Sequence, residues 1–152
     1  MNAAVKLVAD DKVRFSAIPS AMIPILWDEV EHLLALAIEY SSDELNLDIL
    51  RERLLDERML LVLVNIGEEI VAAITVEIKD FDTGKRAMFL TTVGGEKMEI
   101  WMEEFSELAD ELASDKGCDD IYIIGRPGWA KALKKYRFGV CHTVLSRKVR
   151  RK

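Results

Sequence analysis

Apolar residues recur at helical spacing in two stretches of the first third of the chain. Between Ile25 and Ile38 they fall three and four positions apart, and acidic residues occupy the early turns, where the helix dipole favours them. A second stripe of leucines runs from residue 47 to about residue 58, directly after Asn46. Because asparagine commonly caps helix N-termini, the pattern predicts two helices, the second capped by Asn46.

The period then changes to that of β-strands. Three apolar runs follow one another at 59–65, 70–79 and 86–93, separated by short polar turns that each contain a glycine. Runs of this length with tight turns between them predict a three-stranded antiparallel meander. Two β-prone pieces, 5–8 and 13–15, predict a first strand or an ordered lead-in within residues 1–20.

The last third predicts a long amphipathic helix from Lys97 to about Gly117, a short buried strand at 120–124, a short helix at 129–136 and a final strand from Phe138 to Val149. A meander that feeds a crossover helix into a further strand requires a mixed sheet. The fold class is therefore α/β, with a mixed, mostly antiparallel sheet flanked by helices on both faces.

Gly94 and Gly95 stand where the third meander strand gives way to the long helix. Glycines before a helix N-terminus allow backbone amides to approach a phosphate, which the helix dipole also favours. The same pair can equally form a tight turn without a ligand. Whether the chain is an enzyme depends on which of these two interpretations holds.

Length, the lengths of the apolar runs and the distribution of charge limit the classes of protein to which the chain can belong. The chain has 152 residues, enough for the single domain 1–152 that we expect, and no apolar run approaches the ~20 residues of a membrane span. Five cations in the basic tail, 147–152, leave a charge of −11 on the remainder of a chain whose net charge is −6. An acidic body of this kind does not favour nucleic acid as a partner. Without a secretory signal, the expected location is the cytoplasm.

Metal and disulfide chemistry are not indicated. Cys118 and Cys141 form no CxxC pair, and only His142 lies near them, so we expect neither a zinc site nor a disulfide framework. Buried free thiols are the expectation for both cysteines.

The order of elements, with the glycine pair between the third meander strand and the long helix, resembles the GNAT superfamily of acyl-CoA-dependent N-acyltransferases from about Ile25 to Val149. The resemblance implies acetyl-CoA as cofactor, an amine as acceptor, and frequent pairing into homodimers. It places the pantetheine arm beside Thr91 and Thr92. The implied phosphate cradle consists of Val93, Gly94, Gly95, Glu96 and Lys97. Separately, Arg126 opens a cationic run that could attract the same phosphates, dock a partner, or simply form the solvated side of the short helix.

Two strings sharpen the resemblance: Gly94-Gly95 followed by Trp101, and the segment from Gly125 to Phe138. Together they are similar to GNAT-like proteins encoded in tailed-phage and prophage structural gene clusters, in a bacterial host. The usual tyrosine of the short-helix motif is replaced by Leu133. The alternative hypothesis is therefore a non-catalytic GNAT-like protein of virion assembly that binds a phage structural protein and keeps a vestigial cleft.

Acyl transfer to an amine needs a base for the ammonium and an acid for the departing thiolate. Glu77 is the candidate base, because it shares a strand face with Thr75 near the expected acceptor groove. Tyr136 is the candidate acid on the short helix. The commoner alternative is that Glu77 and Lys79 form a solvated strand face, since exposed charged strand positions are frequent.

Overall fold

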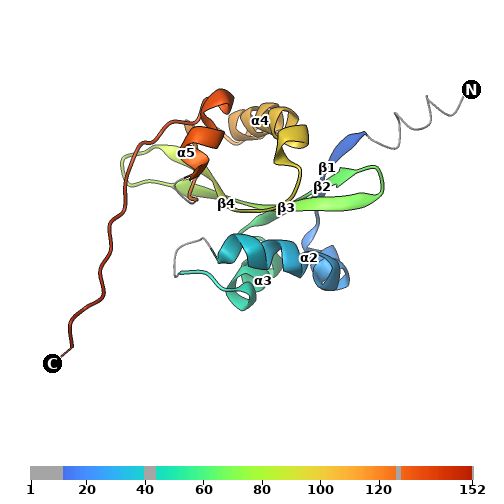
Figure 1. The fold of residues 1–152 in the computed structure, drawn as a ribbon, viewed down its shortest axis with the longest axis horizontal. Helices are drawn as coiled ribbons and strands as arrows, with labels where there is room; N and C mark the ends of the chain where they lie inside the picture. Colours follow the sequence, from blue (N-terminus) through green and yellow to red (C-terminus); the bar gives the residue numbers. More distant parts are fainter. Residues whose placement is uncertain (1–11, 40–43, 126–127, 152) are drawn as a thin grey trace, which may run out of the picture.

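The computed structural model describes residues 12–39, 44–125 and 128–151. Figure 1 shows a central sheet between two helical layers. The elements follow one another as β1 (Val13–Ile18), η1 (Ser20–Met22), α2 (Ile23–Ile38), α3 (Leu47–Leu55), β2 (Leu60–Ile66), β3 (Glu69–Asp80), β4 (Arg86–Gly95), α4 (Met98–Asp115), β5 (Asp120–Ile123), α5 (Gly128–Ala132) and η2 (Lys134–Tyr136).

The sheet has the strand order β1-β2-β3-β4-β5, which is also the order along the chain. The pairs from β1 to β4 are antiparallel, and β5 joins β4 in parallel after the crossover through α4. The predicted meander and the mixed sheet are therefore confirmed. β1 confirms the lead-in strand at 13–15, whereas residues 5–8 lie outside the described part of the chain.

Helices α2 and α3 cover one face of the sheet (Figure 1). Each of the two helices buries one stripe of apolar side chains against the sheet. Asn46 accepts a hydrogen bond of 2.8 Å from the amide of Ile49, which confirms the predicted N-terminal cap of α3. Their buried side chains join those of the facing strands in one cluster: Ile23, Trp27, Val30, Leu33, Leu34, Leu50, Leu54, Met59, Leu61, Leu63 and Ala73.

Helix α4 covers the opposite face together with α5 (Figure 1). Trp101, Met102 and Phe105 project from α4 into the second core cluster, as its apolar stripe predicts. Leu133, which follows α5, is buried in the same cluster. These contacts attach the short helical segment to the sheet and so set the position of one wall of the functional site.

The predicted final strand, Phe138–Val149, is wrong. Residues 138–151 form no helix or strand, and the chain leaves the body of the molecule after η2 (Figure 1). β-branched residues favour a strand only where another strand pairs with them, and within the described residues this segment has no such partner. The predicted single helix at 129–136 is also divided, into α5 and the 3₁₀ turn η2.

None of the helices in the described ranges is long and apolar enough to cross a membrane.

Candidate functional site

Strand β5 pairs with β4 over all of its four residues, but β4 is much longer. The register pairs Ala87 to Leu90 of β4 with Asp120 to Ile123 of β5 and then stops, although β4 continues to Gly95. On its other side β4 stays paired with β3 to its end. After Ile123 the chain no longer pairs with β4, and a cleft lies between the last residues of β4 and the residues Ile124 and Gly125 that follow β5.

A β-bulge marks the point where the β4–β5 ladder ends. Thr75 of β3 pairs with Thr92, and the next residue, Val76, pairs with Leu90, so Thr91 is left without a partner on β3. It has none on β5 either, because that ladder ends at Leu90. An unpaired residue at a bulge leaves backbone hydrogen-bonding groups available to a ligand.

The cleft has a volume of about 240 Å³ and passes between the two helical layers. One side is formed by the end of α2 and the other by the first turns of α4 and by Trp129 of α5. The lining residues are Leu36, Ala37, Thr91, Thr92, Val93, Gly94, Gly95, Met98, Trp101, Ile124, Gly125 and Trp129. Five of the residues predicted to hold a cofactor are thus brought together in one cavity.

The two glycines are the last residues of β4, and close packing explains both of them. A Cβ on Gly94 would lie 1.9 Å from the carbonyl oxygen of Leu33, so the glycine lets α2 approach the sheet. A Cβ on Gly95, whose φ is +143°, would lie 2.3 Å from the carbonyl oxygen of Val71. The backbone of these glycines faces protein atoms at close range, a role that the sequence does not reveal.

Glu96 and Lys97 connect β4 to α4, and neither of these two predicted cradle residues is among those that line the cleft. The amide of Glu96 donates to the carbonyl of Val71 at 2.9 Å, and the carbonyl of Glu96 accepts from the indole Nε1 of Trp101 at 2.8 Å. Lys97 is the N-cap of α4, with a left-handed φ of 59° and no side-chain cap. The first-turn amides of α4 therefore have no capping side chain, and the N-terminal end of this 18-residue helix, where Met98 lines the cleft, carries the positive end of its dipole.

Two threonines meet beside the cleft. The hydroxyls of Thr75 and Thr92 are 2.6 Å apart and buried, so each satisfies the other. The hydroxyl of Thr91 is also buried but has no hydrogen-bond partner among the described residues. A buried hydroxyl without a partner is uncommon and costly, so its position at the bulge is consistent with a ligand group that completes the bond.

Glu77 lies on the same face of β3 as Thr75, two residues closer to the end of the strand. Its Oε2 is buried and has no partner among the described residues, so Glu77 is not simply part of a solvated face. Glu77 pairs across the sheet with Phe89 of β4. The ring of Phe89 stacks on the ring of Tyr122, with 5.0 Å between their centroids, and the Nζ of Lys79 lies 4.6 Å from the centroid of Phe89. The carboxylate therefore lies beside an aromatic surface near the bulge, and it is not among the residues that line the cleft.

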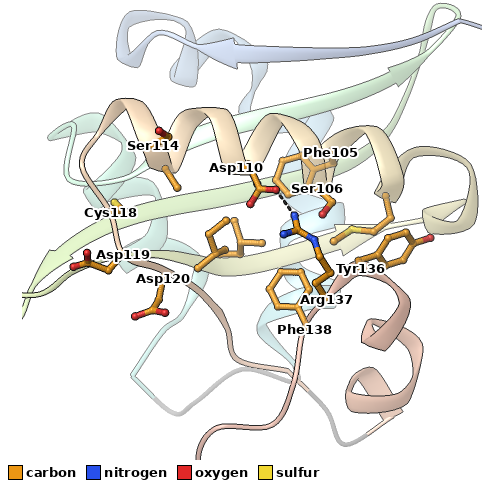
Figure 2. A pocket seen from close by; sticks show the side chains of 15 residues that line it. Phe105, Ser106, Asp110, Ser114, Cys118, Asp119, Asp120, Tyr136, Arg137 and Phe138 are labelled. Atoms are coloured by element: carbon orange, nitrogen blue, oxygen red, sulfur yellow. Dashed lines mark hydrogen bonds and ion pairs between the residues drawn. The ribbon is translucent and has the colours of Figure 1, made fainter.

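The candidate acid, Tyr136, lies elsewhere. It lines a separate groove of about 320 Å³ between α4 and β5, together with Arg137 and Phe138 (Figure 2). Arg137 forms an ion pair with Asp110 of α4 across this groove. The structure does not bring Tyr136 and Glu77 to one cavity, and Arg126 lies outside the described residues.

Several cleft residues have no signal in the sequence. Leu36 and Ala37 belong to the end of α2 and reach the cleft only because Gly94 admits that helix. Trp129 follows Gly125 and Gly128, and its ring lies against Gly125, where an added Cβ would come within 2.7 Å of it. The spacing of Gly125 and Trp129, four positions apart, is the one local feature of the sequence that is consistent with this ring packing on the cleft wall.

Cys118 and Cys141 are both free thiols. Cys118 is half-buried beside the groove, where burial raises its pKa, and Cys141 is free and exposed, which corrects the expectation that both are buried. No group of three or more histidines, cysteines or acidic residues within the described ranges could hold a metal ion.

No protein-family model matches the sequence, and no curated protein does. Solved structures match the fold at low identity. A predicted acetyltransferase with acetyl-CoA from Clostridium acetobutylicum is 16% identical, with a TM-score of 0.61 over 90% of this chain and 96% of the other.

Two further solved structures match the chain in the same way. An aminoglycoside acetyltransferase from an uncultured soil metagenomic sample, in complex with sisomicin, is 12% identical, with a TM-score of 0.62 over 91% of this chain and 99% of that one. A ribosomal-protein-alanine N-acetyltransferase from Brucella melitensis is 13% identical, with a TM-score of 0.62 over 93% and 100% of the two chains. The five-stranded mixed sheet with helices on both faces is thus the GNAT acetyltransferase fold.

Proposed function

We propose that this protein is an N-acetyltransferase that moves an acetyl group from acetyl-CoA to an amine. The observation that carries the proposal is the end of the β4–β5 ladder at a bulge, beyond which a cleft lies between β4 and the residues after β5, beside the first turn of the long helix α4. A fold shared with acetyltransferases supports the same conclusion but could not support it alone, because one fold serves many functions.

The residues present fit acetyl-CoA in part. The cleft is narrow and mostly apolar, which suits an extended pantetheine arm, and Thr91 offers it an unpartnered hydroxyl. The uncapped first turn of α4 and the side chain of Lys97 suit the phosphates. Gly94 and Gly95 would shape this end of the cleft, since their own backbone is occupied by contacts with α2 and β3.

Bound acetyl-CoA would supply the acetyl group as an activated thioester. Because Thr91 has no ladder partner, its backbone amide would donate a hydrogen bond to the acyl oxygen and hold the acyl group at the bulge. Glu77 would accept a proton from the incoming ammonium, either directly or through one water. The second proton of the amine would go to the departing thiolate, directly or through water, since Tyr136 lines the other groove.

Binding of acetyl-CoA can be measured by titration calorimetry on the full chain. We expect saturable binding that Lys97→Glu weakens on the order of tenfold, because the substitution reverses a charge beside the proposed phosphate position. Lys116→Glu is the matched control, since Lys116 caps the other end of α4. No binding at millimolar acetyl-CoA, or equal loss in both variants, contradicts the assignment.

Acetyl transfer can be measured as release of the free thiol with a panel of primary amines. Glu77→Gln should lower kcat/KM on the order of a hundredfold while acetyl-CoA still binds. Glu68→Gln, in the exposed turn between β2 and β3, is the matched control. Full activity of Glu77→Gln would remove Glu77 from the mechanism.

The non-catalytic alternative is favoured by one observation: close packing accounts for both glycines without any ligand. In that case the protein would bind a phage structural protein in the cytoplasm of a bacterial host. Neighbouring genes for portal, capsid or tail proteins, together with failure to bind acetyl-CoA, would support this alternative. Saturable binding of acetyl-CoA would count against it.

A further inference from the structure

Three aromatic side chains, here called the aromatic cluster, lie together on the sheet outside both cores. Phe89 of β4 stacks on Tyr122 of β5, with 5.0 Å between the ring centroids. The ring of Phe81 stands edge-on to both, with its centroid 6.2 Å from that of Phe89 and 6.1 Å from that of Tyr122. All three side chains are half-buried, and neither core cluster includes them. The aromatic cluster is therefore an apolar surface that remains partly open to a ligand.

The strand register places this surface on the side of the sheet that α2 and α3 cover. Phe89 pairs with Tyr122 on one side and with Glu77 on the other, so the three side chains share a face. Leu90, the next residue of β4, is instead buried in the core cluster beneath α4. On the α2 side, the last residue of β3 in the core cluster is Ala73. The aromatic cluster thus lies beyond the part of the sheet where α2 and α3 form their core.

The aromatic cluster also continues the cleft along β4. The β4 residues that line the cleft run from Thr91 to Gly95, so acetyl-CoA bound there would cover the end of the strand. Phe89 precedes Thr91 by two residues, which is about 7 Å along a strand. An amine that attacks an acyl group held at Thr91 therefore has the stretch of β4 before the bulge for the rest of its molecule.

One carboxylate beside the aromatic cluster is available to an ammonium. The Oε2 of Glu77 is buried and has no partner among the described residues. Asp120, by contrast, is paired with Lys85 at 3.6 Å, and the exposed side chain of Lys79 places its Nζ 4.6 Å from the ring centroid of Phe89. Because the two lysines add positive charge, the surface favours a ligand with one ammonium and an apolar, flat body over a polycation.

We propose that this surface binds the acceptor, and that the acceptor is a primary amine with an aromatic ring close to its nitrogen. The inference rests on the proposed function. Glu77 would hold the ammonium, and the ring of the acceptor would pack on Phe89 and displace the flexible side chain of Lys79. Since the Cβ atoms of directly opposed strand residues lie about 5 Å apart, a spacer of about two carbons would allow both contacts.

The transfer step itself is the one proposed above. The nitrogen of the amine forms a bond to the acetyl carbon, and the bond between that carbon and the sulfur breaks. One proton of the ammonium goes to Glu77 and a second goes to the departing thiolate. The aromatic cluster adds no chemical step, so its residues determine which amine is accepted and do not act as acid or base.

The first test compares acceptors in the transfer assay, with the full chain and saturating acetyl-CoA. Phenethylamine should react with a kcat/KM about tenfold or more above that of butylamine, which has the same ammonium without the ring. Spermidine, a polycation without a ring, should be no better than butylamine. Equal values for phenethylamine and butylamine, or a preference for spermidine, overturn the aromatic acceptor while the acetyltransferase activity stands.

Substitutions at Phe89 supply the second test. Phe89→Leu keeps an apolar side chain outside both cores and should raise the KM for phenethylamine about tenfold, which removes the preference over butylamine. Phe89→Tyr, which keeps the ring, should retain that preference. Phe138→Leu is the matched control, because it makes the same substitution in the separate groove between α4 and β5. An equal loss for both amines in Phe89→Leu would mean that Phe89 only supports the fold, and the proposal fails.

Binding without transfer separates this inference from the proposed function. Saturation-transfer NMR detects phenethylamine on the protein with or without CoA, and needs no reaction. Saturable binding that Phe89→Leu weakens, together with no transfer to any amine, would keep the aromatic site and overturn the proposed function. No binding of phenethylamine in either condition overturns the aromatic acceptor, whatever the activity with other amines.

Discussion

The antiparallel part of the sheet and its parallel junction are built differently. β2, β3 and β4 pair along nearly their whole lengths, and helices pack on both faces of this meander. β5 pairs with β4 only from Ala87 to Leu90, because β5 ends there while β4 continues to Gly95. The meander provides rigid support, whereas the junction provides the space in which a ligand can sit.

The comparison also accounts for where polar groups lack partners. In the meander the buried hydroxyls of Thr75 and Thr92 bond to each other. At the bulge beside the junction, the hydroxyl of Thr91 and one carboxylate oxygen of Glu77 are buried without a partner among the described residues. The Nε of Arg51, on α3, is likewise buried without a partner there, so such groups are not confined to the junction, but the two at the bulge lie where a ligand could satisfy them.

The largest effect is expected from Gly94→Ala, at the end of the meander. A Cβ at this position would stand 1.9 Å from the carbonyl oxygen of Leu33, so α2 must move away from the sheet. Overpacking against a backbone atom should lower the free energy of unfolding by about 3 kcal/mol or more. Denaturant unfolding followed by circular dichroism measures the loss.

Gly139→Ala is the matched control, because an added Cβ there meets nothing within 4 Å. Its free energy of unfolding should stay close to that of the unaltered chain. A loss below about 1 kcal/mol in Gly94→Ala would show that α2 yields easily, and the meander would then be less rigid than its packing indicates.

A smaller loss is expected from Trp101→Phe, on the cleft wall. Trp101 is 1% exposed, and its indole donates to the carbonyl of Glu96 at 2.8 Å, in the link between β4 and α4. The substitution leaves that carbonyl unsatisfied and opens a small cavity, at a cost of about 2 kcal/mol. Denaturant unfolding gives the loss, and weaker acetyl-CoA binding in calorimetry should accompany it. Unchanged binding would mean that the link does not shape the cleft.

Local pattern made most of the fold predictable. The stripes of α2, α3 and α4, the cap at Asn46 and the meander all depend on residues close in sequence, and the structure confirms each of them. The final strand predicted at Phe138–Val149 failed because a strand also needs a partner, which local composition does not report.

The candidate site was predictable only in outline. The sequence marks the stretch from Thr91 to Gly95, which does line the cleft. It does not show that Leu33 and Val71 crowd the two glycines, because those contacts come from α2 and β3, far away along the chain. The bulge at Thr91 likewise depends on the register between two strands.

The threonine pair tests the boundary between the two regions. Thr75→Val or Thr92→Val alone leaves one buried hydroxyl without its partner at 2.6 Å and should cost about 1–2 kcal/mol. The double variant removes both hydroxyls and should cost less than the sum of the single losses. Denaturant unfolding of the four chains completes this double-mutant cycle. Additive losses would show that the two hydroxyls do not depend on each other.

The smallest effect is expected from Arg86→Met, where the parallel junction begins. The guanidinium bonds Asp80 at 2.7 Å and the carbonyl of Lys116 at 3.0 Å, which links β3 and β4 to the end of α4. The hydrogen bond and charge of Asp80 raise the pKa of Arg86. A raised pKa gives stability that is complete below the unfolded-state pKa and is lost only as pH rises through the folded-state value, so the link is fully in place at neutral pH.

Because this ion pair is exposed to solvent, its loss should change global stability little, and added salt should reduce the difference further. Hydrogen exchange should nevertheless accelerate in β5, whose short ladder depends on the position of the end of α4, and should stay unchanged in the centre of β3. Equal acceleration in both strands would mean that the junction and the meander open as one unit, and the distinction between a rigid meander and a looser junction would fail.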